Sequence, residues 1–516
     1  MKKIFYRLFN KQNLFFLTFF LILVFGFVVR VININNHGLV FGYDEVEDLI
    51  HVRRIAQNND LVVIGKAIYG NPDIRHGVLS YYLMVPGFLL SHQNPVGVAL
   101  WNGLFSLFTG VVLFFISWSI FKNFRLSLIV FLLYIFSFLV IEYSAWVSHP
   151  TFAPFFVSLF FLGLWKIFEG KSWGYVLSLA SLGFAVQSNL LFIYLIPVFL
   201  IFLLIYKPRL PNLKTIIFSG IVFIVSLSTI IYTEIKFNFS GVKTILNFSG
   251  SFDEGKIPFY EKLKMFSLKI FELLSYNVIP QKNYFGIAIG ISIVLVLLFY
   301  FLKSKQDDRK RIFFLLFFLF SPSVTLFLGY HDKPWTFLGI LPALSLLTAF
   351  AIDKLKYKLL IIPIVALILF LNIKTVSIKE KKSNLFTTMP QSSFLSSQLK
   401  VIDYTYKSSG GKSFSIDAVT YPLYVNTYWS YHYPWYGLKK YGYLPAWFGS
   451  NQLYPYDSLK EASGKEEFLY LIIDNTPDIP SWAKSEAIRT SNAKSCLLEE
   501  KEMDGFIVQK RKLFLK

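Results

Sequence analysis

Long apolar segments recur through the first 374 residues of the chain, and short polar or basic loops separate them. A membrane-spanning helix needs roughly 20 apolar residues, and about eleven segments meet or approach that length. They lie near residues 13–33, 96–121, 126–147, 151–168, 173–188, 190–206, 215–234, 284–302, 312–330, 336–352 and 358–374. The pattern predicts an all-α polytopic membrane bundle over residues 1–374.

The pattern changes after about residue 375, where a polar, serine-rich stretch replaces the apolar runs. A helix is predicted at residues 394–406, and strand-like runs follow at 412–419, 468–474 and 506–511. Turn signals rich in glycine, serine and proline punctuate the region. The sequence therefore predicts a small α/β domain outside the membrane, spanning residues 375–516.

Composition agrees with a membrane protein. Of the 516 residues, 54% are hydrophobic and only 16% are charged. The formal net charge of +20 would suit a nucleic-acid partner, but the basic residues lie in short clusters between apolar runs, as in cytoplasmic loops. We therefore expect the lipid bilayer, and no nucleic acid, as a partner. The lone cysteine, Cys496, excludes an intramolecular disulfide.

The basic clusters alternate along the chain as the positive-inside rule predicts. If the N-terminus is cytoplasmic, all the basic loops fall on the cytoplasmic side. The first apolar run is too long for a signal peptide and has no small-residue cleavage site, so it is interpreted as a helix. We expect a multi-pass protein of the cell (plasma) membrane, with the first outer loop (about residues 34–95) and the C-terminal domain extracytoplasmic.

The first outer loop carries the densest polar chemistry, the sequence DEVEDLIHVRR at residues 44–54. Asp44 is predicted to be the N-cap of a helix, with Glu47 completing a capping-box-like pattern. An ionised carboxylate at a helix N-terminus is also a competent general base, so the two roles are compatible. Polar residues at helical spacing predict an amphipathic surface helix, and the short apolar run at 78–90 predicts a second surface or partly inserted helix.

Several polar residues of the outer face have both a functional and a structural interpretation. Arg53 suits a phosphate, but it also suits lipid headgroups or a carboxylate of its own helix. Lys333 lies in a tight loop from which its side chain can simply reach the membrane interface. Glu142 is predicted within the outer half of a spanning helix, where a carboxylate is costly and indicates either function or a partner.

Three further features each have more than one interpretation. Glu234 suits acceptor binding or a pair with Lys236. Asn189 suits sugar orientation or simple hydration at a helix end. The segment at residues 421–448 is crowded with tyrosine and tryptophan, which suits sugar stacking, an interfacial belt or a domain core.

The order of motifs carries a resemblance. A first spanning helix precedes an outer loop that opens on DEVEDLIHVR (44–53), and the short apolar stretch RHGVLSYYLMVPGFLL (75–90) follows. Further motifs are SHPTFAPFF (148–156), GFAVQSNLLFIYLIPVFLI (183–201) and KPWTFLGILPALSLLTAFAI (333–352). This arrangement resembles the GT-C class of integral-membrane glycosyltransferases, and within it the protein O-mannosyltransferase and aminoarabinose-transferase group. The chain has RHG where that group has a proline-containing element.

The resemblance implies transfer of a sugar, with inversion, from a polyprenyl-phosphate-linked donor to a hydroxyl acceptor of unknown class at the outer membrane face. It implies that Asp44 is the general base and that Glu45 shares the catalytic site. A departing phosphate needs cations rather than a general acid, and the candidates are Arg53, Arg75, His76, His331 and Lys333. The candidate substrate-binding residues are Glu142, His149, Asn189, Glu234 and Trp335.

Other classes of protein remain as alternatives. The sequence has no Walker loop, no dinucleotide fingerprint and no spaced Cys/His metal cluster. The Asp-Glu pair admits a divalent cation, but two carboxylates alone are a weak metal signal, so no cofactor is assigned. A transporter or flippase of a lipid-linked saccharide would have a similar composition, with its charges nearer the bilayer midplane. A non-catalytic assembly protein is the third class.

Overall fold

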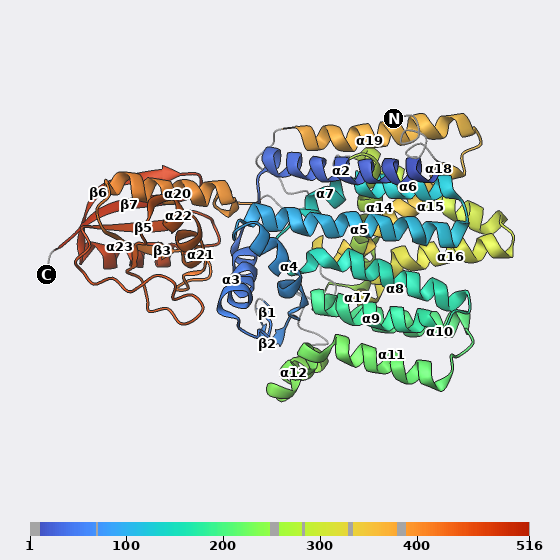
Figure 1. Cartoon of the computed structure of the whole chain (residues 1–516), viewed down its shortest axis with the longest axis horizontal. Coiled ribbons are helices and arrows are strands. Elements are labelled where there is room, and N and C mark those ends of the chain that lie inside the picture. The colour runs from blue at the N-terminus through green and yellow to red at the C-terminus, as the bar shows by residue number, and fades with distance from the viewer. Residues whose placement is uncertain are drawn as a thin grey trace, which may run out of the picture.

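The computed structural model describes residues 11–68, 71–247, 257–280, 284–328, 334–378 and 389–514. The chain forms a bundle of helices with a smaller sheet domain at one end of it (Figure 1). His331 and Lys333, two of the predicted phosphate-binding residues, lie outside the described residues.

Seven helical segments of the described chain are long and apolar enough to cross a membrane. They are Phe16–His37 in α2 (Lys11–His37); Pro95–Phe121 (α5); His149–Phe168 (η1, His149–Phe152, and α8, Ala153–Phe168); Gly286–Lys303 in α15 (Tyr284–Lys303); Gln306–Phe327 (α16, Gln306–Phe320, η3, Ser321–Val324, and α17, Thr325–Leu328); Trp335–Asp353 (η4, Pro334–Ile340, and α18, Leu341–Asp353); and Lys358–Ser377 (η5, Lys358–Leu360, and α19, Ile361–Ser377).

Two bent pairs of helices raise this number to nine if each pair is one span. The pair α6 (Phe124–Ile135) and α7 (Phe138–Ser144) bends by 53°, and the pair α11 (Leu213–Ser226) and α12 (Ser228–Lys236) bends by 61°.

The multi-pass helical bundle is thus confirmed, but the expected count of eleven spans is not. The remaining two apolar segments form shorter helices. Helix α9 (Trp173–Ser188) has 16 residues, and the run Leu190–Tyr206 divides into η2 (Leu190–Tyr194) and α10 (Leu195–Tyr206). Their sequences are apolar enough, but each lacks the length of the other spans.

The first outer loop folds into α3 (Tyr43–Asn58), a short hairpin of β1 (Ala67–Ile68) and β2 (Asn71–Arg75), and α4 (Leu79–Leu90). The prediction that Asp44 is an N-cap is wrong, because the N-cap position is Gly42 and no side chain caps the helix. Asp44 instead lies in the first turn, where its carboxylate is free to contact Lys66. The connection after α12 carries α13 (Ser240–Asn247), and α14 (Phe259–Val278) follows it.

Helix α3 lies where the bundle meets the C-terminal domain (Figure 1). Every residue from Glu45 to Val52 is buried, charged residues included. The helix is therefore covered on more than one side, and each of its polar groups needs a partner.

The C-terminal domain is a five-stranded sheet in the order β4-β3-β5-β7-β6. Its elements are α20 (Leu395–Ser409), β3 (Phe414–Val419), α21 (Thr427–His432), η7 (Tyr433–Gly437), α22 (Leu438–Tyr441), β4 (Ala446–Trp447), β5 (Phe468–Asp474), α23 (Ser481–Asn492), β6 (Ser495–Met503) and β7 (Phe506–Leu513). Strand β3 is parallel to β4 and β5, and β7 is antiparallel to β5 and β6. The α/β class, the predicted helix and all three predicted strands are confirmed.

The aromatic segment at residues 421–448 supplies much of the domain core. Trp429, Tyr431 and Tyr433 are fully buried, and Trp429 packs against Phe506. Burial of such large side chains contributes strongly to the stability of a small domain. Trp429 and Tyr433 contact residues of the sheet, so a core role explains them. Tyr431 is buried instead against Phe41 and Gln93, at the junction with the rest of the protein.

The C-terminal domain is joined to the outer loop by backbone and side-chain hydrogen bonds. The amide of Phe41 donates to Ser393 O (2.8 Å), and the amide of Leu395 donates to Leu39 O (3.0 Å). The buried amide of Gln398 donates to Phe41 O (2.8 Å) and to Ser392 O (3.0 Å). The segment before α3 is therefore held directly by the domain.

We predict that Gln398→Ala destabilises the protein by about 2–4 kcal/mol, because it leaves two buried carbonyl groups without their donor. Thermal unfolding of the purified protein in detergent measures the change. Lys407→Ala, on the exposed part of the same helix, is the matched control and should shift stability by less than about 0.5 kcal/mol. Equal melting temperatures for the two variants would contradict the role given to Gln398.

Candidate active site

A buried lysine joins two carboxylates of α3. The Lys66 ammonium lies 3.0 Å from Asp44 Oδ1 and 2.9 Å from Asp48 Oδ1. The side chains of Lys66 and Asp48 are 4% and 0% exposed, whereas that of Asp44 is 64% exposed. Asp48 thus anchors the lysine inside the protein, and the lysine positions a carboxylate that faces solvent.

The second oxygen of Asp48 joins α3 to the start of η1. Asp48 Oδ2 accepts from the backbone amide of His149 (3.0 Å) and lies 3.2 Å from its Nδ1. The ring of His149 in turn packs on the ring of His76, with centroids 4.2 Å apart. The structure therefore brings together Asp44, His76 and His149, which are far apart in the sequence.

Glu45, the other half of the Asp-Glu pair, points into the protein. Its buried carboxyl group accepts a hydrogen bond from Trp146 Nε1. The Trp146 ring lies 6.3 Å from the ring of Trp335, a predicted substrate-binding residue. Trp146 is held in place because its carbonyl accepts from Thr151 Oγ1 (2.8 Å).

The balance of burial and neighbouring charges favours the protonated form of Glu45 and the ionised forms of Asp48 and Lys66. Burial raises the pKa of Glu45 to about 7, and the nearby charge of Asp44 adds to this effect. Burial opposes the ionised form of Asp48, but Lys66 and His149 outweigh it and hold the pKa of Asp48 below its ordinary value. Burial likewise opposes the Lys66 ammonium, but Asp44 and Asp48 raise the pKa of Lys66 well above its ordinary value.

His76 does not behave as a cation in this site. Burial lowers its pKa well below the ordinary value, and the neighbouring His149 adds to the effect. At neutral pH the His76 ring is therefore neutral and suited to hydrogen bonding rather than to charge neutralisation.

The other predicted residues lie in separate environments. Arg53 Nη1 donates to Ser430 O (3.1 Å), and its guanidinium lies over the Tyr431 ring at 5.5 Å, so it faces the C-terminal domain. The Arg75 guanidinium lies over Phe237 at 4.8 Å. Glu142 lies 3.6 Å from His37 Nδ1, at the end of α2.

Two of the predicted residues make local backbone contacts. Asn189 caps η2, since its side chain accepts from the amide of Leu191 (2.9 Å). Glu234 accepts from the amide of Val242 (3.1 Å). Each of these two side chains therefore has a local backbone partner.

Sequence reasoning missed Lys66. It stands in the stretch IGKAIYG, where no periodic pattern or motif marks it. The available signal was that it is the only lysine in the predicted outer loop, with carboxylates close enough in sequence to pair with it.

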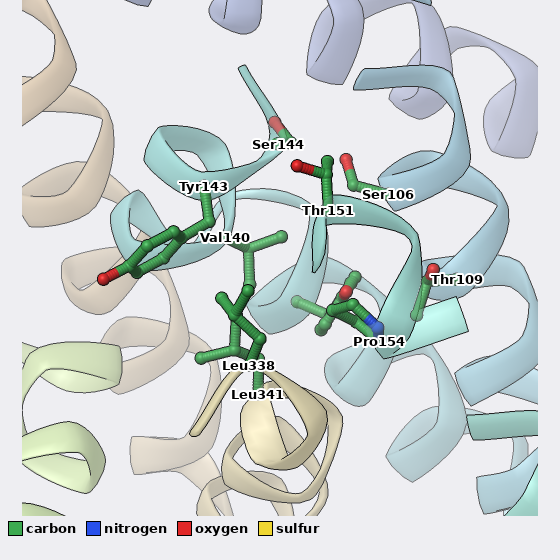
Figure 2. A pocket seen from close by; sticks show the side chains of 10 residues that line it. Ser106, Thr109, Val140, Tyr143, Ser144, Thr151, Pro154, Leu338 and Leu341 are labelled. Atoms are coloured by element: carbon green, nitrogen blue, oxygen red, sulfur yellow. The ribbon is translucent and has the colours of Figure 1, made fainter. Parts of the chain in front are cut away.

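A small cavity lies inside the bundle and is lined by side chains that include Ser106, Tyr143 and Thr151 (Figure 2). The space open to the centre of a water molecule is about 10 Å³, which suits a single water molecule. The cavity is too small for any ligand larger than a water molecule. Among the described residues, no group of three or more His, Cys, Asp or Glu side chains is arranged to hold a metal ion.

Comparison with known proteins identifies the fold. No family model matches the chain, and no curated protein matches it. The crystal structure of ArnT from Cupriavidus metallidurans in the apo state matches with a TM-score of 0.60 and 9% identity, covering 97% of this chain and 98% of that chain. The structure of the same ArnT bound to undecaprenyl phosphate matches with a TM-score of 0.61 and 11% identity, covering 95% of this chain and 97% of that chain.

The chain has the same fold as ArnT. The likeness spans nearly the whole of both chains, so it includes the C-terminal domain as well as the bundle. At such low identity the match concerns the fold, and the resemblance seen in the sequence motifs is confirmed at that level.

We predict that Glu45→Gln changes the pH dependence of stability. Between pH 4.5 and pH 7 the folded Glu45 carboxyl holds a proton that the unfolded chain releases, so its contribution to stability falls as pH rises through this window. The variant should therefore gain stability relative to the unmodified protein between pH 5 and pH 8, by up to about 3 kcal/mol.

Thermal unfolding of both proteins across this pH range measures the difference in their stability. Histidine titration contributes equally to both proteins and cancels in this difference. Asp73→Asn, at an exposed carboxylate of the same outer loop, is the control, and its stability should depend on pH as that of the unmodified protein does. Parallel pH profiles for Glu45→Gln and the unmodified protein would refute the shifted pKa of Glu45.

Proposed function

We propose that the chain is a membrane glycosyltransferase that moves a sugar from a polyprenyl-phosphate-linked donor to a hydroxyl acceptor. The observation that carries the proposal is the exposed Asp44 carboxylate held 3.0 Å from the buried Lys66 ammonium. The fold supports it, because ArnT, whose structure includes a complex with undecaprenyl phosphate, has the same fold.

In the proposed reaction Asp44 is the general base. The acceptor hydroxyl oxygen attacks the anomeric carbon of the donor, and its proton passes to the Asp44 carboxylate. The bond between the anomeric carbon and the phosphate oxygen breaks on the opposite face, so the configuration inverts. The exposure of Asp44 suits this role, because an acceptor must reach it from the aqueous side.

The polyprenyl phosphate leaves as an anion and needs positive charge near it. Lys66 is the cation nearest to the base, and Arg75 lies at the end of β2 in the same outer loop. We propose that Arg75 stabilises the leaving phosphate, whereas Lys66, which is buried and contacts Asp44 on the attacking side, positions the base. Neutral His76 is suited to donate a hydrogen bond.

The proposal places this chemistry on the extracytoplasmic side, with the N-terminus in the cytoplasm. The alternation of basic loops supports this orientation. A lipid-linked donor suits it as well, because the phosphate of such a donor lies at the membrane boundary, next to the first outer loop.

We predict that Asp44→Asn lowers the transfer rate by about 10²–10⁴-fold, since the amide cannot accept the hydroxyl proton. The assay follows labelled product in membranes supplied with a defined panel of polyprenyl-phosphate sugars. Asp73→Asn removes a carboxylate from the same loop and should leave the rate unchanged.

Full activity of Asp44→Asn would eliminate Asp44 as the base. Movement of the lipid-linked sugar across reconstituted vesicles, with no glycosylated product, would instead favour the flippase alternative.

We predict that a membrane-impermeant maleimide labels the exposed Cys496 in intact cells. A Cys496→Ser variant with a new cysteine at Asp73 should label equally well without lysis, because both positions are proposed to be extracytoplasmic. Labelling of either site only after lysis would overturn the orientation.

A further inference from the structure

We propose that the loop from Thr420 to Asn426, together with the start of α23, binds a saccharide acceptor on a platform formed by Tyr424 and Trp482. The inference rests on the proposed function, since the acceptor must present a hydroxyl group to Asp44. It gives a role to aromatic side chains of the C-terminal domain that its core does not use.

The topology of the sheet favours a binding site at this position. After β3 the chain passes to β4 on one side of β3, and after β5 it passes through α23 to β6, which lies on the opposite side of β5. The loops leaving β3 and β5 therefore diverge to opposite sides, which is the arrangement at which open α/β sheets bind ligands, outside the carboxyl ends of the strands. Thr420–Asn426 follows β3, and α23 follows β5.

This carboxyl edge of the sheet faces the candidate active site. The ring of Tyr421 lies 6.1 Å from the ring of Tyr43, which directly precedes Asp44. The hydroxyl of Tyr456 donates to Glu47 Oε1 (3.1 Å), one turn further along α3. A ligand on the carboxyl edge would therefore be adjacent to the proposed base.

Two large aromatic rings are exposed at this edge. The side chain of Tyr424 is 58% exposed and that of Trp482 is 56% exposed. Trp482 precedes Glu486 by four residues on α23, so these two side chains lie on one face of the helix. The Tyr424 hydroxyl donates to Glu486 Oε2 (3.4 Å), which brings Tyr424 to the same face. Exposed aromatic rings beside a carboxylate offer both stacking and hydrogen-bond acceptance, which is the chemistry that a saccharide uses.

The loop that carries Tyr424 is braced in a strained conformation. Tyr424 has a φ of +67°, in the left-handed region that a bulky residue rarely adopts. The side chain of Gln452 holds the loop, accepting from the amide of Asn426 (2.8 Å) and donating to Tyr424 O (3.0 Å). Strain that neighbouring contacts maintain in this way is typical of functional loops, and here it is the backbone carrying Tyr424 that they hold.

The same surface suits a polypeptide acceptor less well. Extended peptides are commonly bound by pairing with the exposed edge of a strand. The proposed surface consists of loops at strand ends, with ring faces and a carboxylate rather than a row of free backbone groups. Tyr421 and Tyr424 are three residues apart, at most roughly 10 Å of chain, so a short oligosaccharide on Tyr424 can extend towards Asp44.

The test measures saccharide binding directly and needs no donor. The full chain in lipid nanodiscs is titrated with soluble oligosaccharides of mannose, glucose, galactose and arabinose, and saturation-transfer NMR reports binding. We expect at least one of these probes to bind, with affinity lowered about tenfold by Tyr424→Ala and by Trp482→Ala. Tyr424→Phe keeps the ring and should retain binding.

The matched control is Phe514→Ala. Phe514 is 54% exposed, but it follows β7 at the opposite edge of the sheet, so its loss should not alter binding. Binding of none of the probes, equal binding by all variants, or binding of a serine- and threonine-rich peptide through Tyr424 in place of a saccharide would each overturn the proposal.

The experiment also separates this inference from the proposed function. Asp44→Asn should keep saccharide binding while losing transfer. If Asp44→Asn retains transfer but Tyr424→Ala loses saccharide binding, the assignment of the base fails and the saccharide site stands. If transfer depends on Asp44 but Tyr424→Ala and Trp482→Ala leave saccharide binding unchanged, the saccharide site fails and the assignment of the base stands.

Discussion

The buried ion pair between Lys66 and Asp48 is the interaction on which the end of the bundle next to the C-terminal domain depends. Both side chains are almost completely removed from solvent, and loss of one partner from such a pair leaves an uncompensated charge that costs about 3–5 kcal/mol. The pair is tolerable because Asp48 also accepts from the amide of His149 and because Lys66 also contacts Asp44. These contacts join α3, the segment before β1 that carries Lys66, and the start of η1.

Two neighbouring carboxylates on α3 have opposite environments. Successive residues of an α-helix point about 100° apart, so Asp44 faces solvent while Glu45 enters the protein beneath Trp146. The same chemical group is thus available to a substrate at one position and is pushed towards its protonated form at the next. The pair is one motif in the sequence but two different groups in the structure.

The C-terminal domain takes part in forming the candidate site. Arg53, Glu47 and Phe41 all contact it, so the polar groups of α3 are shared between the bundle and this domain. A helix that lies against two bodies can bury charged residues only when both supply partners. This shared packing leaves Asp44 exposed at the junction, next to the loops that leave the parallel strands.

Local patterns in the sequence determined the apolar spans, the helix at the start of the C-terminal domain and its three buried strands, because hydrophobic periodicity reflects which faces are buried. They also indicated the carboxylate loop, since charged residues beside an apolar run are conspicuous. Strand β6 escaped prediction because most of its residues are exposed and it lacks an apolar alternation.

Only the tertiary structure decided which polar residues meet. Asp48 and His149 are 101 residues apart, and Arg53 and Ser430 are 377 residues apart, so no local period relates them. It also separated Glu142, which pairs with His37, from the carboxylate and lysine cluster, and it revealed the role of Lys66. The physical reason is that periodicity reports burial along one element, whereas a site is formed by side chains whose distances depend on how several elements pack.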